Sequence, residues 1–284
     1  MPVIALASPK GGCGKTTAAL LLATELAQKG IGVTVLDADP ETYIDTWAKL
    51  PDKPPSLTVK KSPTEQTILD DIDKAKQESP FVIIDLEGTA NMLVAYAISR
   101  ADLVIIPLQP SDLDARGAAK ALQLVRQQQK AFNRTIPHAI LFTRTKAAIR
   151  TKTFTHISQQ LTQNKITIFK THLMEREVYR ALFSYGGCLE NLDPKDVYHL
   201  QDAINNARAF AGEVISMVNS PHTPSTRPTQ ELEGVLTLVN PEPQFLLTRI
   251  FLRLRISLRL LRTFLHRPFA RKRSLPPLPF PWRN

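Results

Sequence analysis

Ten residues near the start of the chain, SPKGGCGKTT (8–17), combine glycines, lysines and threonines in a pattern suited to binding phosphate. The general phosphate-loop pattern is Gly, four residues, then Gly-Lys-Ser/Thr. Gly14, Lys15 and Thr16 match the end of this pattern, but Pro9 stands where its first glycine belongs. A second lysine, Lys10, follows the proline. The stretch therefore raises the question of what a second lysine does beside a phosphate loop.

Each residue type in this loop has a role toward a nucleoside triphosphate. Glycines let backbone N–H groups close on the phosphates, and the start of the following helix adds its positive end. We expect Lys15 to reach the β- and γ-phosphates, Thr16 to ligate Mg²⁺ through its hydroxyl, and Thr17 to contact the α-phosphate. The residues expected to bind ATP are Lys10, Gly11, Gly12, Cys13, Gly14, Lys15, Thr16 and Thr17.

Acidic residues close two apolar stretches downstream of the loop. VLDADP (35–40) contains Asp37 and Asp39, and FVIID (81–85) ends in Asp85. Ligands of open α/β sheets bind at the carboxyl ends of the strands, so these carboxylates should meet Lys15 in one crevice. Asp85 has the place of a Walker B aspartate, which holds Mg²⁺ through water. A strand-ending aspartate can also be a turn former or a helix cap.

The positioning of these residues requires a sheet whose strands are mostly parallel, with helices on both faces. Apolar strands alternate with helices over residues 1–218, which predicts the α/β fold of a P-loop NTPase. Strands are expected at 3–7, 32–39, 81–85, 101–108, 138–145 and 166–171. Helices are expected at 15–28, 64–78, 112–131, 151–163 and 196–217.

The composition of the chain indicates its general class and its division into segments. A chain of 284 residues with 43% hydrophobic content can bury a full core. Two cysteines are too few for a disulfide framework, and the start of the chain lacks the pattern of a secretion signal, so we expect a cytoplasmic protein. The character of the sequence changes near 219. We expect a Pro/Ser/Thr-rich linker at 219–244 and a basic, apolar extension at 245–284.

Charge is distributed unevenly along the chain, whose net value is +10. Residues 115–174 hold eleven Lys or Arg and no Asp or Glu, whereas residues 1–114 have an excess of acids. Such asymmetry predicts an anionic partner for the middle of the chain. The alternative is a solvated basic face that balances the acidic first part.

Three of these motifs together resemble the ParA/MinD group of deviant-Walker ATPases. They are KGGCGKTT (10–17), DADPE (37–41) and FVIID (81–85), and the group's loop reads Lys-Gly-Gly-x-Gly-Lys-Thr. The resemblance covers roughly residues 1–217 and includes ADLVIIPLQPSDLDARGA (101–118). Within the group, the chain looks most similar to ParA-like proteins of alphaproteobacterial plasmids, including the one that promotes T-DNA transfer in agrobacteria.

The resemblance implies an answer to the question of the second lysine. In the group, the lysine matching Lys10 reaches the phosphates of the other subunit, so that two ATP molecules lie sandwiched in a homodimer. By the same resemblance, Asp39 would orient the attacking water, and Asp37 and Asp85 would support the Mg²⁺ shell. The catalytic residues would then be Lys10, Lys15 and Asp39. Glu41 and the segment DLEGTAN (85–91) depart from the usual pattern, which leaves the hydrolysis rate open.

The resemblance also implies a biological role. ParA-type dimers bind DNA without sequence preference when ATP is present, which predicts a slow, partner-stimulated ATPase acting in plasmid or chromosome partition or in conjugative DNA transfer. Candidate DNA contacts in the acid-free segment are Arg144, Lys146, Arg150 and Lys152.

Two alternatives belong to other functional classes. One is a MinD-like positioning ATPase that contacts anionic membrane through the extension at 245–284, although this extension could equally be disordered or dock nucleic acid. The other is a metabolic enzyme on the same fold, such as a ligase-type or reductase relative. The reductase branch needs cluster-ligating cysteines that Cys188 alone cannot supply.

Overall fold

The computed structural model describes residues 1–61, 63–89, 91–145 and 152–220. Almost all of the expected linker (219–244) and the whole extension (245–284) lie outside this part. Lys146 and Arg150, two of the expected DNA contacts, also lie outside it.

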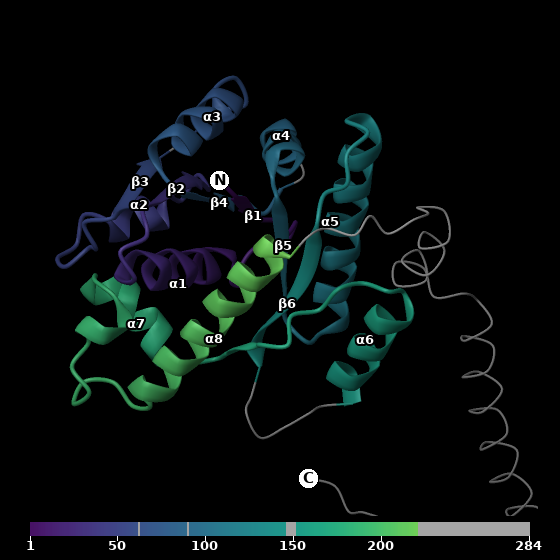
Figure 1. The fold of residues 1–284 in the computed structure, drawn as a ribbon. Helices are drawn as coiled ribbons and strands as arrows, with labels where there is room; N and C mark the ends of the chain where they lie inside the picture. Colours follow the sequence, from purple (N-terminus) through teal and green to yellow (C-terminus); the bar gives the residue numbers. More distant parts are fainter. Residues whose placement is uncertain (62, 90, 146–151, 221–284) are drawn as a thin grey trace, which may run out of the picture. The chain divides into compact units, whose positions relative to one another are not determined.

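A sheet of seven strands forms the centre of the described part (Figure 1). Its order is β3-β2-β4-β1-β5-β6-β7, and every strand pairing is parallel. The strands are β1 (Val3–Leu6), β2 (Val33–Ala38), β3 (Leu57–Lys61), β4 (Phe81–Leu86), β5 (Leu103–Leu108), β6 (His138–Thr145) and β7 (Leu173–Met174).

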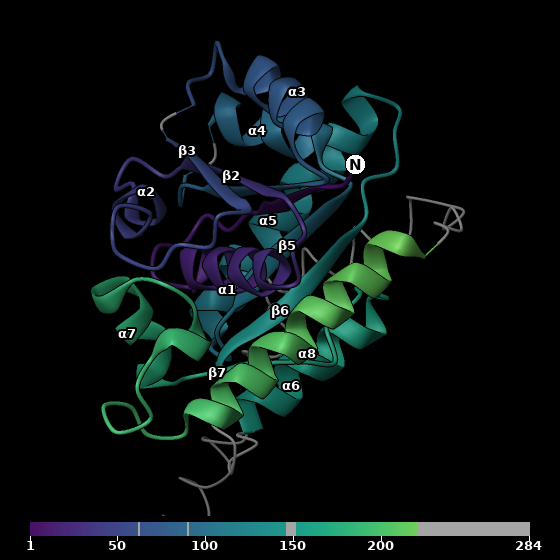
Figure 2. The ribbon, with the colours of Figure 1, turned by 60° about the vertical axis from the view of Figure 1, so that its left-hand side comes forward.

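Helices cover both faces of this sheet, as Figures 1 and 2 show from two directions. Helices α1, α2, α7 and α8 share one apolar core with the sheet, and α3, α4, α5 and α6 share the other. The helices are α1 (Lys15–Gln28), α2 (Tyr43–Trp47), α3 (Ile68–Glu78), α4 (Met92–Arg100), α5 (Asp112–Ala131), α6 (Lys152–Gln163), α7 (Glu177–Tyr185) and α8 (Leu200–Asn219). None of them is long and apolar enough to cross a membrane.

The central strands are apolar on both sides because both sides are covered. Successive residues of β1 alternate between the two cores: Ile4 and Leu6 join the core under α1, while Val3 and Ala5 join the other. Helix α1 is buried over most of its length, from Ala18 to Ala27. The phosphate loop between β1 and α1 is therefore fixed at both ends to the most buried elements of the fold.

The predicted α/β fold with a parallel sheet is confirmed, but one predicted strand is wrong. Residues 166–171 form only an isolated bridge at Ile168, and the last strand is the short β7 that follows them. The backbone N–H groups of Lys170 and Thr171 donate to the Glu213 carboxylate on α8, at 2.7 and 2.9 Å, instead of joining a strand ladder. Strand β3 and helices α2, α4 and α7 were not expected from the sequence.

Candidate nucleotide-binding site

The phosphate loop turns sharply between β1 and α1, and glycine makes the turn possible. Gly12 has φ of 72° and Gly14 has φ of 96°, both in the left-handed region that side chains disfavour. Helix α1 then begins at Lys15, the residue expected from the sequence. The loop therefore opens directly onto the positive end of a long helix, which is the local structure that binds phosphate.

Residues at or beyond the carboxyl ends of three other strands lie against the phosphate loop. After β5, Gln109 Nε2 donates to the Gly12 carbonyl oxygen at 2.7 Å. At the end of β6, Thr143 Oγ1 donates to the Cys13 carbonyl oxygen at 2.7 Å. After β4, a Cβ added at Gly88 would lie 3.2 Å from a backbone nitrogen of the phosphate loop. The segment after β4 therefore packs closely against the phosphate loop.

The two lysines of the loop have different surroundings. Lys15 is 5% exposed, and its Nζ lies 3.5 Å from the Lys10 carbonyl oxygen, within the loop. The Lys10 side chain is 40% exposed, and its Nζ lies 2.7 Å from Asp114 Oδ2 on α5. Lys15 thus faces into the loop, whereas Lys10 lies at its rim.

Asp37 and Asp85 lie side by side at the carboxyl ends of β2 and β4. They are direct partners in the register of the two strands, and both are fully buried. Asp37 Oδ2 accepts a hydrogen bond from the Asp45 backbone N–H at 2.9 Å. Asp37 Oδ1 and both carboxylate oxygens of Asp85 have no hydrogen-bond partner among the described residues. Three buried acceptor atoms are thus left unsatisfied beneath the phosphate loop.

Burial makes the charged forms of these acids unfavourable. The pKa of Asp85 is raised to about 7, and burial is the largest cause. The nearby charges of Asp37 and Asp39 add to the rise, while the side chain of Thr16 and the charge of Lys15 oppose it. Burial is also the main cause of the raised pKa of Asp37. A cation bound beside Asp85 would stabilise the charged form of its carboxyl group.

The donor set fits Mg²⁺. Carboxylate and hydroxyl oxygens are the ligands that Mg²⁺ prefers, and Asp85, Asp37 and Thr16 supply both kinds. The described residues contain no cluster of three or more His, Cys, Asp or Glu that could hold a metal ion alone. Mg²⁺ commonly binds through one or two carboxylates together with water and substrate phosphates.

Asp39 lies just beyond the end of β2, on a tight turn. Its Oδ1 accepts from the Glu41 backbone N–H at 3.1 Å, and its carbonyl oxygen accepts from the Thr42 N–H at 3.0 Å. The side chain is only partly buried. The structure therefore brings Asp39 close enough to influence Asp85 electrostatically while leaving it accessible to water.

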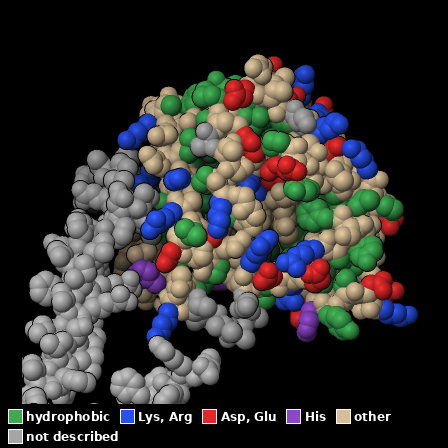
Figure 3. Space-filling view, turned by 180° about the vertical axis from the view of Figure 1, so that it is seen from behind, with side chains coloured by type: hydrophobic (Ala, Val, Ile, Leu, Met, Phe, Trp, Pro, Cys, Tyr) green, Lys and Arg blue, Asp and Glu red, His purple; other side chains and the backbone are tan. Residues whose placement is uncertain are grey.

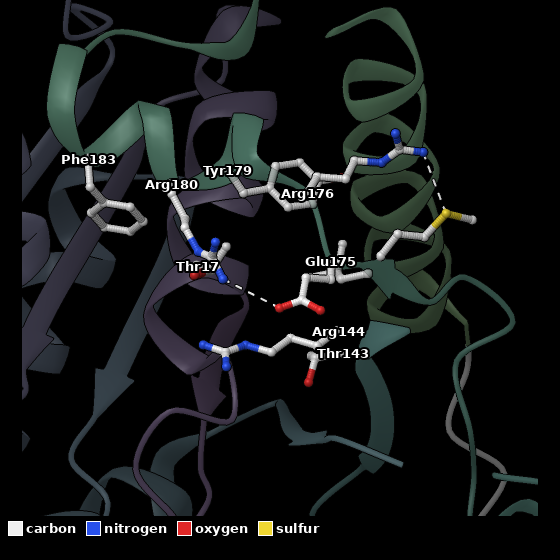
Figure 4. Close-up of a pocket in the computed structure, with 11 residues that line it drawn as sticks. Thr17, Thr143, Arg144, Glu175, Arg176, Tyr179, Arg180 and Phe183 are labelled. Atoms are coloured by element: carbon white, nitrogen blue, oxygen red, sulfur yellow. Dashed lines mark hydrogen bonds and ion pairs between the residues drawn. The ribbon is translucent and has the colours of Figure 1, made fainter. Parts of the chain in front are cut away.

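A pocket adjoins the phosphate loop at Gly14 and Thr17 (Figure 4). The ends of β6 and β7 and the start of α7 line its other sides, and it encloses about 500 Å³ of space, part of it open to solvent. Figure 4 shows Arg144, Glu175 and Arg180 directed toward one another near Thr17; Arg180 and Glu175 form an ion pair at 3.4 Å. The pocket therefore borders Thr17, the residue predicted to contact the α-phosphate.

The basic residues expected to bind DNA are not all placed together. Arg144 lines the pocket beside the phosphate loop, where its φ of 50° is an uncommon conformation for a residue other than glycine. Lys152 is exposed at the first residue of α6 and does not line that pocket. On the face seen in Figure 3, Lys and Arg side chains are interspersed with acidic ones.

The sequence interpretation missed several residues that shape the site. Gln109 and Thr143 follow the rule that the carboxyl ends of parallel strands face the ligand, so this rule could have found them. Asp114 could have been noticed as an acid in the first turn of α5, three residues after the N-cap Ser111. Arg176 lines the pocket from a loop that carried no recognisable motif.

Comparison with known proteins agrees with this geometry. The family model for the VirC1 protein matches residues 1–193. Protein ParA of Rhizobium radiobacter is 43% identical over 211 residues, which cover 74% of this chain and 95% of the relative. The chain belongs to the VirC1/ParA family. This family contains ParA-like partition and positioning ATPases, as the resemblance in the motifs predicted.

Solved structures show the same fold at low sequence identity. An ATP complex of a Cyanothece McdA variant has a TM-score of 0.62 at 16% identity and covers 78% of this chain and 98% of its own. The MinD cell division protein of Aquifex aeolicus has a TM-score of 0.57 at 19% identity and covers 76% of this chain and 98% of its own.

Proposed function

We propose that this protein is an ATP-dependent molecular switch. Its phosphate loop binds the triphosphate through Lys15 and the backbone of residues 11–17, and the pocket beside Thr17 takes the nucleoside. Mg²⁺ lies between the nucleotide and the carboxylates of Asp85 and Asp37. The support for this assignment is the set of unsatisfied buried oxygens beneath the loop, together with ATP in the Cyanothece relative. Asp39 orients the water that attacks the γ-phosphate.

The observation that carries the switch proposal is the division of labour between the two lysines. The buried Lys15 already supplies a cation to the phosphates of its own subunit. Lys10 lies at the rim with 40% of its side chain exposed, where it can reach a second nucleotide. Two triphosphates that face each other repel, so a cation from each subunit would stabilise a dimer that forms only with ATP.

The output of the switch is nonspecific DNA binding. The supporting observation is the segment 115–174, which has no carboxylate, together with exposed Lys152 at the start of α6. Acting with an adaptor protein that stimulates hydrolysis, the ATP-bound dimer would serve plasmid or chromosome partition, or conjugative DNA transfer, in the cytoplasm. Hydrolysis would return the protein to monomers and release the DNA.

The central test measures ATP-dependent dimerisation by light scattering. The wild type should become a dimer with ATP–Mg²⁺ and remain a monomer with ADP. Lys10→Ala should bind nucleotide yet stay monomeric, and Asp39→Ala should remain trapped as the dimer because its hydrolysis is slow. Glu65→Ala, at an exposed acid outside the phosphate loop and the turn of Asp39, is the control and should behave as wild type. A wild type that ATP leaves monomeric would sink the proposal.

DNA retention of the same samples tests the output. Duplex DNA of unrelated sequences should be retained only with ATP, and retention should fall steeply with salt concentration because phosphate contacts release counterions. Joint charge reversal at Arg150 and Lys152 should weaken retention, whereas reversal at the exposed Lys165 is the control. Retention without ATP, or a flat salt dependence, would argue against this output. ATP-dependent binding to anionic vesicles without DNA binding would instead favour the MinD-like alternative.

A further inference from the structure

The second lysine of the phosphate loop forms an ion pair in the single subunit. Lys10 Nζ lies 2.7 Å from Asp114 Oδ2, in the first turn of α5. The Lys10 side chain is 40% exposed, whereas that of Asp114 is only 3% exposed. A cation at the surface is therefore tied to a carboxylate that is buried in the fold.

The surroundings of Asp114 make this contact costly to break. The Ser111 hydroxyl also donates to Asp114 Oδ2, and the same hydroxyl oxygen accepts from the Asp114 backbone N–H at 3.2 Å. Asp114 Oδ1 is buried with no hydrogen-bond partner among the described residues. Without the Lys10 ammonium, the buried carboxylate would keep only a neutral hydroxyl as its partner, and an uncompensated buried charge is strongly unfavourable.

The position of α5 allows Lys10 to lie close to its surface. A Cβ added at Gly117, one turn after Asp114, would come 3.6 Å from the Lys10 Cβ and 4.0 Å from the Pro9 ring. The rim of the phosphate loop thus packs against the first turns of α5. This packing directs the lysine toward its own subunit.

We propose that Asp114 restrains Lys10 and thereby sets the ATP concentration at which two subunits pair. The inference rests on the proposed function, because it assumes that Lys10 contacts a second subunit's nucleotide. Asp114 is buried within its own subunit, so a Lys10 side chain extended across an interface must give up the 2.7 Å contact. Pairing of two subunits therefore requires the triphosphate to compete with Asp114 for Lys10. A ligand that binds Lys10 more weakly leaves the ion pair with Asp114 intact.

The restraint predicts a gain of function when Asp114 loses its charge. Asp114→Asn keeps the size of the side chain but weakens its hold on Lys10. The ATP concentration for half-maximal dimerisation should fall by about tenfold, within the usual range of coupling between two sites. Asp112→Asn is the matched control, since Asp112 is an exposed acid in the same helical turn. Its half-maximal concentration should stay within about twofold of wild type.

A double variant tests whether the effect passes through Lys10. In the Lys10→Ala background, Asp114→Asn should not restore dimerisation, because no lysine remains to be released. Ser111→Ala, which removes a hydroxyl from Asp114 but leaves its charge, should shift the half-maximal concentration less than Asp114→Asn. Thermal unfolding of each variant establishes that it is folded. Dimerisation of Lys10→Ala/Asp114→Asn, or an unchanged half-maximal concentration for folded Asp114→Asn, overturns the inference.

Failure of the proposed function gives a different result. If the wild type stays monomeric at every ATP concentration but Asp114→Asn dimerises with ATP, the proposed switch of the wild type is wrong, whereas the restraint of Lys10 by Asp114 is supported. If both stay monomeric, with ATP bound, both the pairing and the restraint are wrong.

Discussion

A buried acidic residue lies near each end of helix α1, and the two acids differ in the partners that surround them. Near its first turn, Asp85 is fully buried and neither of its carboxylate oxygens has a hydrogen-bond partner among the described residues. Toward its last turn, Glu25 is 3% exposed and lies 3.8 Å from Arg208 on α8. Arg208 also contacts Glu190 at 2.8 Å.

The difference separates a region built for a ligand from one built for the fold. A buried carboxylate without a partner lowers stability, so it persists where something outside the chain completes it. A cation bound from solution would stabilise the charged forms of Asp37 and Asp85. Glu25 instead lies near the cationic side chain of Arg208 on helix α8. The first region should therefore respond to nucleotide and Mg²⁺, and the second only to pH and packing.

The largest expected effect comes from removing the cation at the first end of α1. Lys15→Ala should weaken ATP binding by about 1000-fold or more, roughly 4 kcal/mol, because it removes the buried cation that lies within the phosphate loop. Isothermal titration with ATP–Mg²⁺ measures the loss. Lys29→Ala, at the exposed C-cap of the same helix, is the control and should leave the affinity within about twofold. Equal losses of ATP affinity in Lys15→Ala and Lys29→Ala would mean that the two ends of α1 do not differ in nucleotide binding.

The first end of α1 was predictable from the sequence because its residues are tied to local backbone needs. Glycines around Lys15 mark a turn that only they can make, and the helix start at Lys15 followed from the same pattern. Asp37 and Asp85 followed from the parallel sheet, which brings the ends of β2 and β4 together. The sequence thus predicted the loop, the acids and the parallel α/β class of the fold, but not every strand and helix.

Contacts between distant elements were not predictable in the same way. The pairing of Glu25 with Arg208 depends on how α8 packs across α1, and nothing local marks either residue. Asp114 reaches Lys10 across 104 positions of sequence. The wrongly predicted strand at 166–171 has the same origin, since Glu213 on α8 takes the N–H groups that a strand would have used.

An intermediate effect is expected from neutralising the unpaired acid. Asp85→Asn should raise the free energy of unfolding of the nucleotide-free protein at pH 8 by about 2 kcal/mol, because it removes a buried charge whose burial outweighs its interactions with Thr16 and Lys15. The same change should weaken Mg²⁺-dependent ATP binding by about tenfold, since an amide is a poorer ligand than a carboxylate. Urea unfolding and titration with and without Mg²⁺ measure the two effects.

Opposite signs for stability and binding are the signature of a ligand site. Asp70→Asn, an exposed acid in the first turn of α3, is the control and should change neither quantity by more than about 0.5 kcal/mol. If Asp85→Asn lowered stability instead, Asp85 would have a structural partner, and the contrast with Glu25 would fail.

The smallest effect concerns the pH dependence of the second region. Burial raises the pKa of Glu25 to about 7 from 4.5, and the neighbouring Glu190 charge adds to the rise, while Arg208 opposes it. Between these two pKa values the folded protein binds more protons at Glu25 than the unfolded chain does. Stability contributed by this group is therefore present below about pH 4.5 and is lost as the pH rises toward 7.

Glu25→Gln should remove this part of the pH dependence. The free energy of unfolding of the variant, relative to wild type, should rise by about 1 kcal/mol between pH 5 and pH 8, because only the wild type ionises a buried acid over that range. Urea unfolding at several pH values measures the difference, with Glu65→Gln, an exposed acid, as the control. Nucleotide affinity should be unaffected, since Glu25 lies ten residues along α1 from Lys15, about 15 Å. Parallel stability curves for wild type and Glu25→Gln would mean that Arg208 fully compensates the charge, and a change in ATP affinity would mean that the two ends of α1 act as one site.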